Sequence, residues 1–210
     1  MPKKSPAKSG TSSSKLTNKS STKAAARSVP TAAVKPRQDA GKSAVAQPDE
    51  AIAPARRKPA PDFLLPRKDG PPASLADFRG RKIVLFFYPK ADTPGCTKEA
   101  IDFNRLKSAF DATGTDIVGI SADPAKAQDK FCIKHDLGLP MISDEARNVI
   151  DAYGAWGEKS MYGRTFEGVL RTTVLVDQAG RIAQVWRNVR VDGHADAVLA
   201  AARALEPSAD

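Results

Sequence analysis

The sequence predicts an α/β domain in which helices cover both faces of a mixed central sheet, preceded by a disordered basic tail. Three observations lead to this prediction. The excess positive charge lies in residues 1–60, short β-branched and aromatic runs alternate with helix-like segments after it, and two adjacent strand-like runs follow near the C-terminus.

The N-terminal segment differs in composition from the rest of the chain. The first 60 residues contain 13 Lys and Arg against 3 Asp and Glu, whereas the remaining 150 are close to neutral. Such a segment cannot bury enough apolar surface to offset its ordering entropy. We therefore expect a disordered tail over residues 1–58 and one folded domain over residues 59–210, long enough for a hydrophobic core.

The N-terminal segment also gives an expectation about the cellular compartment of the protein. No apolar stretch of signal-peptide length follows the early lysines, and the longest apolar run, "IVLFFY", is strand-sized rather than the roughly 18 residues of a membrane span. We expect a cytoplasmic protein without membrane contact. A nuclear or organellar location is the alternative if the tail is a targeting segment, although Lys outnumbers Arg in it.

The first half of the folded part alternates between strands and helices. After a short apolar segment and a helical turn at residues 74–78, the run "KIVLFFYP" predicts a strand buried on both faces. From Thr97, apolar residues at helical spacing predict a helix that continues through Phe110. "DIVGISAD" then predicts a second buried strand.

The second half ends in an antiparallel pair. "PAKAQDKFCIKHDLG" predicts a helix with Pro124 in its first turn and Gly138 as its stop. A short strand and helix, a polar loop "EKSMYGRTFEG", two strands joined at residues 178–180, and a final Ala/Leu helix complete the chain. This order, with parallel crossovers first and a hairpin last, is that of a thioredoxin-like mixed sheet.

Cys96 stands at the junction of the first strand and the first helix. If the helix begins near Pro94, Cys96 lies in its first turn, where unpaired N–H groups and the helix dipole stabilise a thiolate. Gly95 permits close approach of another group, and Thr93 supplies a hydroxyl three residues before the sulfur. The simpler alternative is that Cys96 is only a small first-turn residue.

The cysteine has no partner at short spacing. Thr-x-x-Cys occupies the place where a disulfide oxidoreductase of the thioredoxin type has Cys-x-x-Cys, and disulfide exchange requires both sulfurs. A single thiolate beside a hydroxyl instead suits attack on a substrate that reacts once and leaves an oxidised cysteine.

The stretch "YPKADTPGCTKEA" resembles the peroxiredoxin active-site pattern Pro-x-x-x-Thr-x-x-Cys through Pro89, Thr93 and Cys96. Its "DTPGCTKEA" form is similar to the peroxiredoxin Q group, also called bacterioferritin-comigratory protein. The resemblance extends from about residue 62 to 206 and does not include the tail. It implies a thioredoxin-fold peroxidase that reduces hydrogen peroxide and organic hydroperoxides at the expense of thiols.

The resemblance also implies a role for each matching residue. Cys96 would attack the peroxide and become a sulfenic acid, Thr93 would hydrogen-bond the peroxide, and Pro89 would shield the sulfenic acid. Arg171 would stabilise the thiolate; independently, a cation near the start of an apolar strand is costly to bury unless it meets an anion. Glu99 either holds the arginine or is an ordinary first-turn acid favoured by the dipole.

The resolving step has two open alternatives. Many members of the group carry a resolving cysteine five residues after the first, but here that residue is Ile101. Cys132 resembles the resolver of another branch, and would form an intramolecular disulfide with Cys96 that a thioredoxin-like protein reduces. A disulfide requires Cα atoms within about 7 Å, so local unwinding is expected. Alternatively Cys132 is a buried small hydrophobe, and an external thiol acts directly.

Remaining features predict little further chemistry. Cys132 and His135 form a C-x-x-H pair without a partner cluster, so we expect no metal and no cofactor, and His135 on the solvent side of its helix. Residues 1–58 could contact nucleic acid weakly by counterion release, or serve only as a solubilising linker. The expected partners are a peroxide and a thioredoxin-like reductant, and the expected state is a monomer, as is common in the group.

Overall fold

The structure, a computed structural model, describes residues 51–66, 71–161 and 164–205. The strands in this part of the chain are β1 Leu64–Leu65, β2 Ala73–Ser74, β3 Lys82–Phe87, β4 Thr115–Ser121, β5 Met141–Ser143, β6 Trp156–Met161, β7 Arg164–Val169, β8 Thr172–Val176 and β9 Ile182–Trp186. Its helices are η1 Pro54–Arg56, η2 Leu75–Phe78, α1 Pro94–Arg105, α2 Lys107–Asp111, α3 Ala125–His135, α4 Asn148–Ala152 and α5 His194–Ala204. None of these described helices has the length and apolar character needed to span a bilayer.

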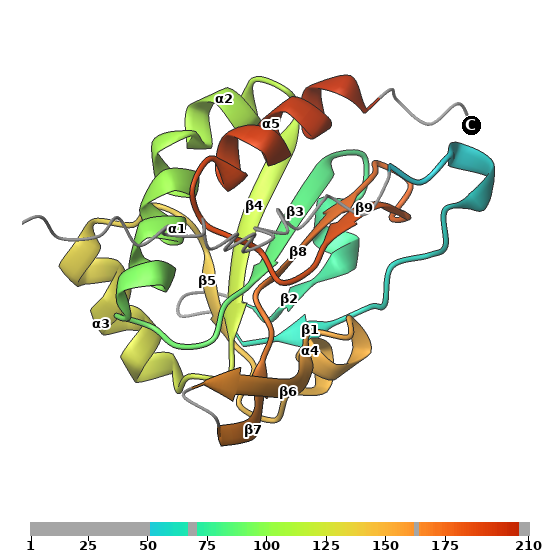
Figure 1. The fold of residues 1–210 in the computed structure, drawn as a ribbon. Helices are drawn as coiled ribbons and strands as arrows, with labels where there is room; N and C mark the ends of the chain where they lie inside the picture. The colour runs from blue at the N-terminus through green and yellow to red at the C-terminus, as the bar shows by residue number, and fades with distance from the viewer. Residues whose placement is uncertain (1–50, 67–70, 162–163, 206–210) are drawn as a thin grey trace, which may run out of the picture. The chain divides into compact units, whose positions relative to one another are not determined.

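Five strands form the central sheet, in the order β5-β4-β3-β8-β9 (Figure 1). β4 is parallel to both β3 and β5, whereas β8 is antiparallel to both β3 and β9. The predicted mixed sheet is therefore confirmed. β3, the run "KIVLFF", is buried along its whole length, as expected for a central strand covered on both faces.

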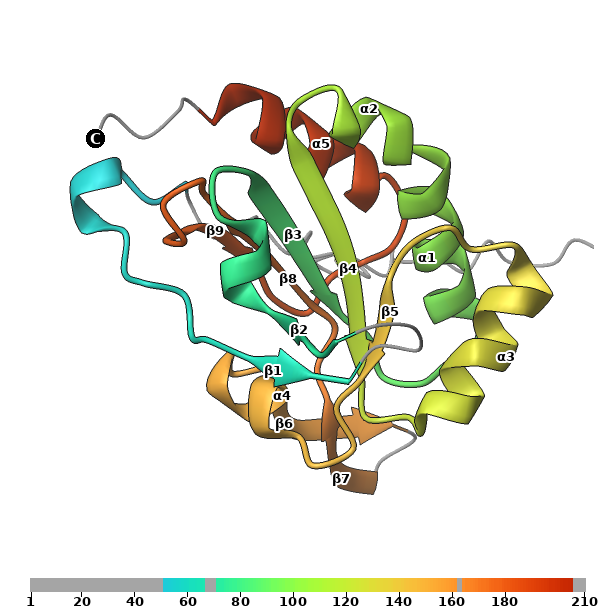
Figure 2. The ribbon, with the colours of Figure 1, turned by 180° about the vertical axis from the view of Figure 1, so that it is seen from behind.

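Helices cover both faces of this sheet, as predicted (Figures 1 and 2). Alternate side chains of β3 point to opposite faces. Val84 and Phe86 contribute to a first core with residues of α1, α2, α3 and α5. Leu85 and Phe87 contribute to a second core with residues of β1, β2, η2 and α4. Cys96 belongs to the first core.

The segment "EKSMYGRTFEG" belongs to an antiparallel hairpin, β6–β7, and the prediction of a polar loop is wrong. The pairing runs from Trp156 opposite Val169 to Met161 opposite Arg164. Residues 164–167 are exposed, so this strand has no apolar pattern of the kind that revealed the buried strands. Backbone pairing, rather than burial, defines the hairpin.

Two predicted helices have different ends in the structure. The periodic segment predicted as one helix is divided into α1 and α2 at Leu106, whose ψ of 1° is not helical. α3 ends before the predicted Gly138, because Asp136 adopts a left-handed conformation (φ 50°) that terminates the helix. Pro124 is the N-cap residue of α3 rather than a first-turn residue.

The predicted tail, residues 1–58, lies outside the described residues up to residue 50. Its last part contacts the sheet. The backbone N–H of Ile52 donates to the carbonyl of Ala183 at 2.8 Å, and Arg57 pairs with the buried carboxylate of Asp177 at 3.1 Å.

Candidate active site

Cys96 lies in the first turn of α1, which follows the carboxyl end of β3 (Figure 1). Thr93 is the N-cap residue and Pro94 the first helical residue, as the sequence predicts. The side chain of Cys96 is 1% exposed. This position directs unpaired backbone N–H groups and the positive end of the helix dipole toward the sulfur, and both favour an anion there.

Arg171 reaches the sulfur from the start of β8. The pairing of Thr172 with Phe87 brings the residue before β8 next to the chain that leaves β3. Nη2 of Arg171 donates a hydrogen bond to Sγ of Cys96 at 3.2 Å. A Cβ atom at Gly95 would lie 3.3 Å from the same nitrogen, so glycine leaves room for the guanidinium at the helix start.

Glu99 forms a buried ion pair with Arg171, one turn of helix after the cysteine. Nη1 of Arg171 donates to Oε2 of Glu99, whose side chain is 1% exposed. Burial raises the pKa of Glu99 to about 7, although the charge of Arg171 acts in the opposite direction. Oε1 makes no hydrogen bond to any described residue. Of the two alternatives left open by the sequence, the geometry is that of a carboxylate holding the arginine.

A pocket of about 400 Å³ opens beside this cluster. Arg171 lines it together with Pro89, Glu158, Lys159, Ser160, Phe166, Leu170, Asn188 and Val189. Because Arg171 both lines the pocket and donates to Cys96, the thiol lies one hydrogen bond away from the pocket wall. The hydroxyl of Thr93 donates to the carbonyl of Lys90 at 2.9 Å and does not cap the helix.

The sequence gives no indication that the β6–β7 hairpin lines this pocket. Lys159 and Phe166 are opposite each other in the hairpin, so their side chains share one face. Burial lowers the pKa of Lys159; among its neighbours, Cys96 acts to raise it and Arg171 to lower it. Lys159 therefore lies within electrostatic range of both. No apolar pattern in "EKSMYGRTFEG" signals these residues, because the hairpin is defined by backbone pairing.

Cys132 is partly buried on α3 and packs against the same core that contains Cys96. Both cysteines are thiols in this structure, not a disulfide. The hydroxyl of Tyr88 donates to Oε1 of Gln128 at 2.9 Å. Burial raises the pKa of Tyr88, and the charges of Asp123 and of both cysteines act in the same direction. The two sulfurs therefore lie within electrostatic range of one phenol ring.

His135 is not the solvent-facing residue that the sequence predicts. Its side chain is 19% exposed, its ring lies 5.2 Å from that of Phe131, and Nε2 lies 2.9 Å from Oδ1 of Asp92. Within the described ranges, no group of three or more His, Cys, Asp or Glu side chains is arranged to hold a metal ion.

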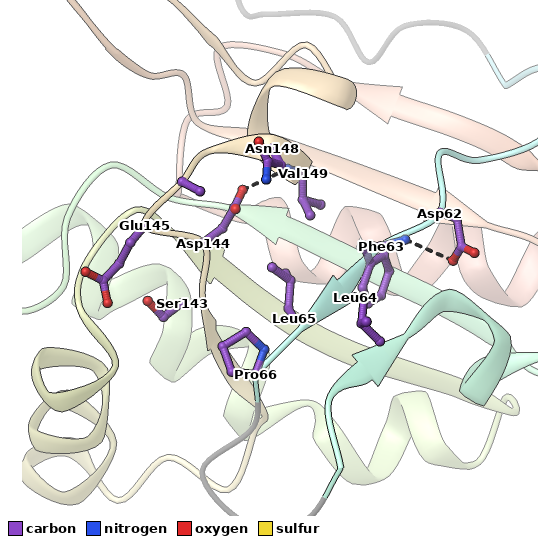
Figure 3. A pocket seen from close by; sticks show the side chains of 11 residues that line it. Asp62, Phe63, Leu64, Leu65, Pro66, Ser143, Asp144, Glu145, Asn148 and Val149 are labelled. Carbon is purple, nitrogen blue, oxygen red and sulfur yellow. Dashed lines mark hydrogen bonds between the residues drawn. The ribbon is translucent and has the colours of Figure 1, made fainter.

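A larger pocket, of about 510 Å³, lies between β1 and the segment from β5 to α4 (Figure 3). Two of its three carboxylates accept hydrogen bonds from the backbone: Oδ2 of Asp144 accepts from the N–H groups of Val149 and Ile150, and Oδ1 of Asp62 accepts from that of Phe63. Among the described residues that line it there is neither a thiol nor a cation. This pocket therefore lacks the chemistry found at Cys96.

Residues 57–185 match the AhpC/TSA family. The chain is also 43% identical over 148 residues to peroxiredoxin Bcp of Xanthomonas campestris, a match that spans 70% of this chain and 92% of that protein. The chain belongs to the AhpC/TSA family, as a peroxiredoxin of the Q group. Peroxiredoxin Bcp of Escherichia coli is 39% identical over 140 residues, 67% of this chain and 90% of that protein.

Solved structures agree with this assignment. Peroxiredoxin Q of Xanthomonas campestris gives a TM-score of 0.64 at 42% identity and covers 68% of this chain and 90% of that one. BcpB of Mycobacterium tuberculosis gives 0.63 at 36% identity, over 71% and 97%. The predicted thioredoxin-like fold and the peroxiredoxin family are thus confirmed. This peroxiredoxin is a peroxidase whose family uses a peroxide and a thiol reductant.

Proposed function

We propose that this peroxiredoxin reduces hydrogen peroxide and organic hydroperoxides through Cys96. The thiolate attacks the terminal peroxide oxygen in line with the O–O bond, so that an S–O bond forms while the O–O bond breaks. The departing oxygen takes up a proton and leaves as water or an alcohol. Cys96 becomes a sulfenic acid.

One contact carries this proposal: the hydrogen bond from Arg171 to the buried sulfur of Cys96 at the start of α1. The guanidinium and the helix N-terminus stabilise the thiolate before attack, and Arg171 also faces the pocket in which the leaving oxygen gains charge. The carboxylate of Glu99 accepts a hydrogen bond from Nη1 of Arg171 and so holds the guanidinium in position. By family resemblance, Thr93 binds the peroxide and Pro89, in the pocket wall, shields the sulfenic acid.

Cys132 then resolves the sulfenic acid. Its thiolate attacks the sulfur of Cys96, the S–O bond breaks, and the hydroxyl leaves as water with one proton, which gives a Cys96–Cys132 disulfide. A thioredoxin-like dithiol restores both thiols by exchange. The packing of Cys132 against the core of Cys96 supports this route. The presence of Ile101 where many relatives carry a resolving cysteine excludes the route along α1.

The size of the pocket favours organic hydroperoxides as substrates. About 400 Å³ is far more than a molecule of two oxygen atoms needs, and Phe166, Leu170 and Val189 form apolar walls. A structure of Xanthomonas campestris bacterioferritin comigratory protein, with a TM-score of 0.66 and 41% identity, is described as giving insight into the alkyl peroxide reduction activity of that protein.

Peroxide consumption with a thioredoxin-like reductant tests the proposal. Cys96→Ser is expected to abolish consumption, whereas Cys132→Ser is expected to keep the first turnover and lose the following ones. Full activity in Cys96→Ser would contradict the role of Cys96. Full steady-state activity in Cys132→Ser would instead support a one-cysteine enzyme that an external thiol reduces.

A further inference from the structure

The loop that joins β3 to α1 is fastened to the last turn of α3. The two carboxylate oxygens of Asp92 accept hydrogen bonds from Nζ of Lys134 at 2.8 and 2.7 Å, and Oδ1 lies 2.9 Å from Nε2 of His135. Lys134 and His135 follow Cys132 by two and three residues, and Asp92 precedes Cys96 by four. We call these three residues the Asp92 clasp.

Several features hold the clasp in place. Asp92 adopts a left-handed backbone conformation (φ 61°) in the loop between β3 and α1. The neighbouring N–H of Ala91 donates to Oδ2 of Asp123 at 2.7 Å, just before α3. The hydrogen bonds from His135 and Lys134 lower the pKa of Asp92, which therefore stays ionised at neutral pH. The loop before Cys96 is thus attached near both ends of the helix that carries Cys132.

We propose that the Asp92 clasp controls how fast Cys96 and Cys132 meet, which makes Asp92 a positioning residue for the resolving step. This inference rests on the proposed role of Cys132. Disulfide formation brings the two Cα atoms within about 7 Å, and we expect the first turn of α1, the last turn of α3, or both to unwind locally for it. The clasp joins the loop just before α1 to the last turn of α3, so it opposes unwinding that moves these two segments apart.

The clasp adjusts the resolving step rather than blocking it. All three side chains are at least partly exposed, and exposed ion pairs contribute little and are screened by salt. A slower resolution prolongs the life of the sulfenic acid. A second peroxide can then oxidise it to a sulfinic acid, so the clasp also sets the sensitivity of the enzyme to excess peroxide.

Asp92→Asn removes the charge with little change of shape, and Asp196→Asn is a matched control. Asp196 is an exposed carboxylate that pairs with Arg105 at 3.1 Å and links α1 to α5 instead of α3. After one equivalent of hydrogen peroxide, samples of the full chain are quenched by alkylation at successive times, and the Cys96–Cys132 disulfide is quantified by mass spectrometry. The rate of peroxide consumption is recorded in the same experiment. The rate of disulfide formation divided by the rate of peroxide consumption then measures the resolving step alone.

We expect the ratio of disulfide formation to peroxide consumption to rise about two- to fivefold in Asp92→Asn and to stay unchanged in Asp196→Asn. Salt at about 1 M should accelerate resolution in the wild type but not in Asp92→Asn. Lys134→Gln should also accelerate it, and the double variant should be less than additive. These responses separate a broken ion pair from general loosening of the fold.

Two failures are distinguishable. If the disulfide forms at the same rate, or more slowly, in Asp92→Asn, the clasp inference is overturned and the proposed function stands. If the wild type forms no Cys96–Cys132 disulfide and Cys132 remains a thiol, the proposed resolving role is overturned, and the clasp inference with it.

Discussion

Arg171 donates from one guanidinium to both the sulfur of Cys96 and the carboxylate of Glu99. A lysine ammonium is a compact charge and cannot reproduce this two-sided geometry. We expect Arg171→Lys to lower kcat/KM for hydrogen peroxide on the order of 10²-fold, the usual cost of a lost electrostatic donor. Stopped-flow peroxide consumption measures this effect. Arg105→Lys, an exposed arginine on α1, is the control, and equal activity of the two variants would contradict the role of Arg171.

Glu99 makes stability depend on pH. Its pKa of about 7 in the folded state lies above its ordinary value of 4.5, so the folded protein binds more protons than the unfolded chain between these values. The contribution of Glu99 to the free energy of unfolding should therefore fall by on the order of 3 kcal/mol as pH rises from about 4.5 to 7. His194, whose pKa burial lowers to about 4, acts in the opposite direction over the same range, so the contribution of Glu99 is the difference between the wild type and Glu99→Gln. Urea titrations at pH 5 and pH 8 test this. From pH 5 to pH 8 the wild type should lose stability relative to Glu99→Gln; if the difference in unfolding free energy between the two proteins is the same at both pH values, Glu99 is not a source of pH dependence.

At the scale of single residues, the sequence predicts the site residues that lie close to Cys96 along the chain, and not those that are distant from it in sequence. Pro89, Thr93 and Cys96 stand in one motif, and the helix start at Pro94 follows from a strand end and a proline. The partner of Glu99 could be proposed only through a family arginine 72 residues away. Lys159 was missed because only the paired hairpin brings it near the sulfur.

Among the elements, the β6–β7 hairpin contributes Glu158, Lys159, Ser160 and Phe166 to the lining of the pocket. Phe166 presents an aromatic ring there and is 43% exposed. We expect Phe166→Ala to raise KM for an aromatic hydroperoxide about 3- to 10-fold, because apolar contact with the ring is lost, and to leave hydrogen peroxide kinetics nearly unchanged. Ile133→Ala, at an exposed apolar residue of α3 outside the pocket, is the control. An equal effect on both peroxides would argue against a substrate-binding wall.

The sequence predicts the buried strands correctly and does not predict the exposed hairpin. β3 is buried throughout and β8 equally so, and both were predicted from their apolar runs. β7 is mostly exposed and was predicted as a loop, because an exposed hairpin depends on backbone pairing that leaves no apolar pattern. The break between α1 and α2 at Leu106 was missed because the apolar spacing continues across it.

At the scale of the whole molecule, the folded unit begins before the composition of the sequence changes. Arg57 is 8% exposed and its partner Asp177 2%, so this ion pair is buried. A chain that begins at residue 51 should be as stable as the full chain, whereas one that begins at residue 59 should lose about 3 kcal/mol, because it leaves Asp177 without Arg57. Urea unfolding of both truncations tests this. Equal stability would show that residues 51–58 contribute nothing.

The function of the basic tail remains a prediction from composition. If it binds nucleic acid by counterion release, retention on DNA should weaken with salt and disappear when residues 1–50 are removed. Retention that survives the truncation would place the binding surface elsewhere.

The most direct test of the account is the fate of the two sulfurs after a single turnover. The reduced enzyme is mixed with one equivalent of hydrogen peroxide, alkylated, and analysed by intact mass and by peptide mapping without reduction. We predict a loss of two hydrogen atoms and a peptide pair that joins Cys96 to Cys132. A sulfenic or sulfinic acid that persists on Cys96, with Cys132 recovered as an alkylated thiol, would contradict the two-cysteine mechanism.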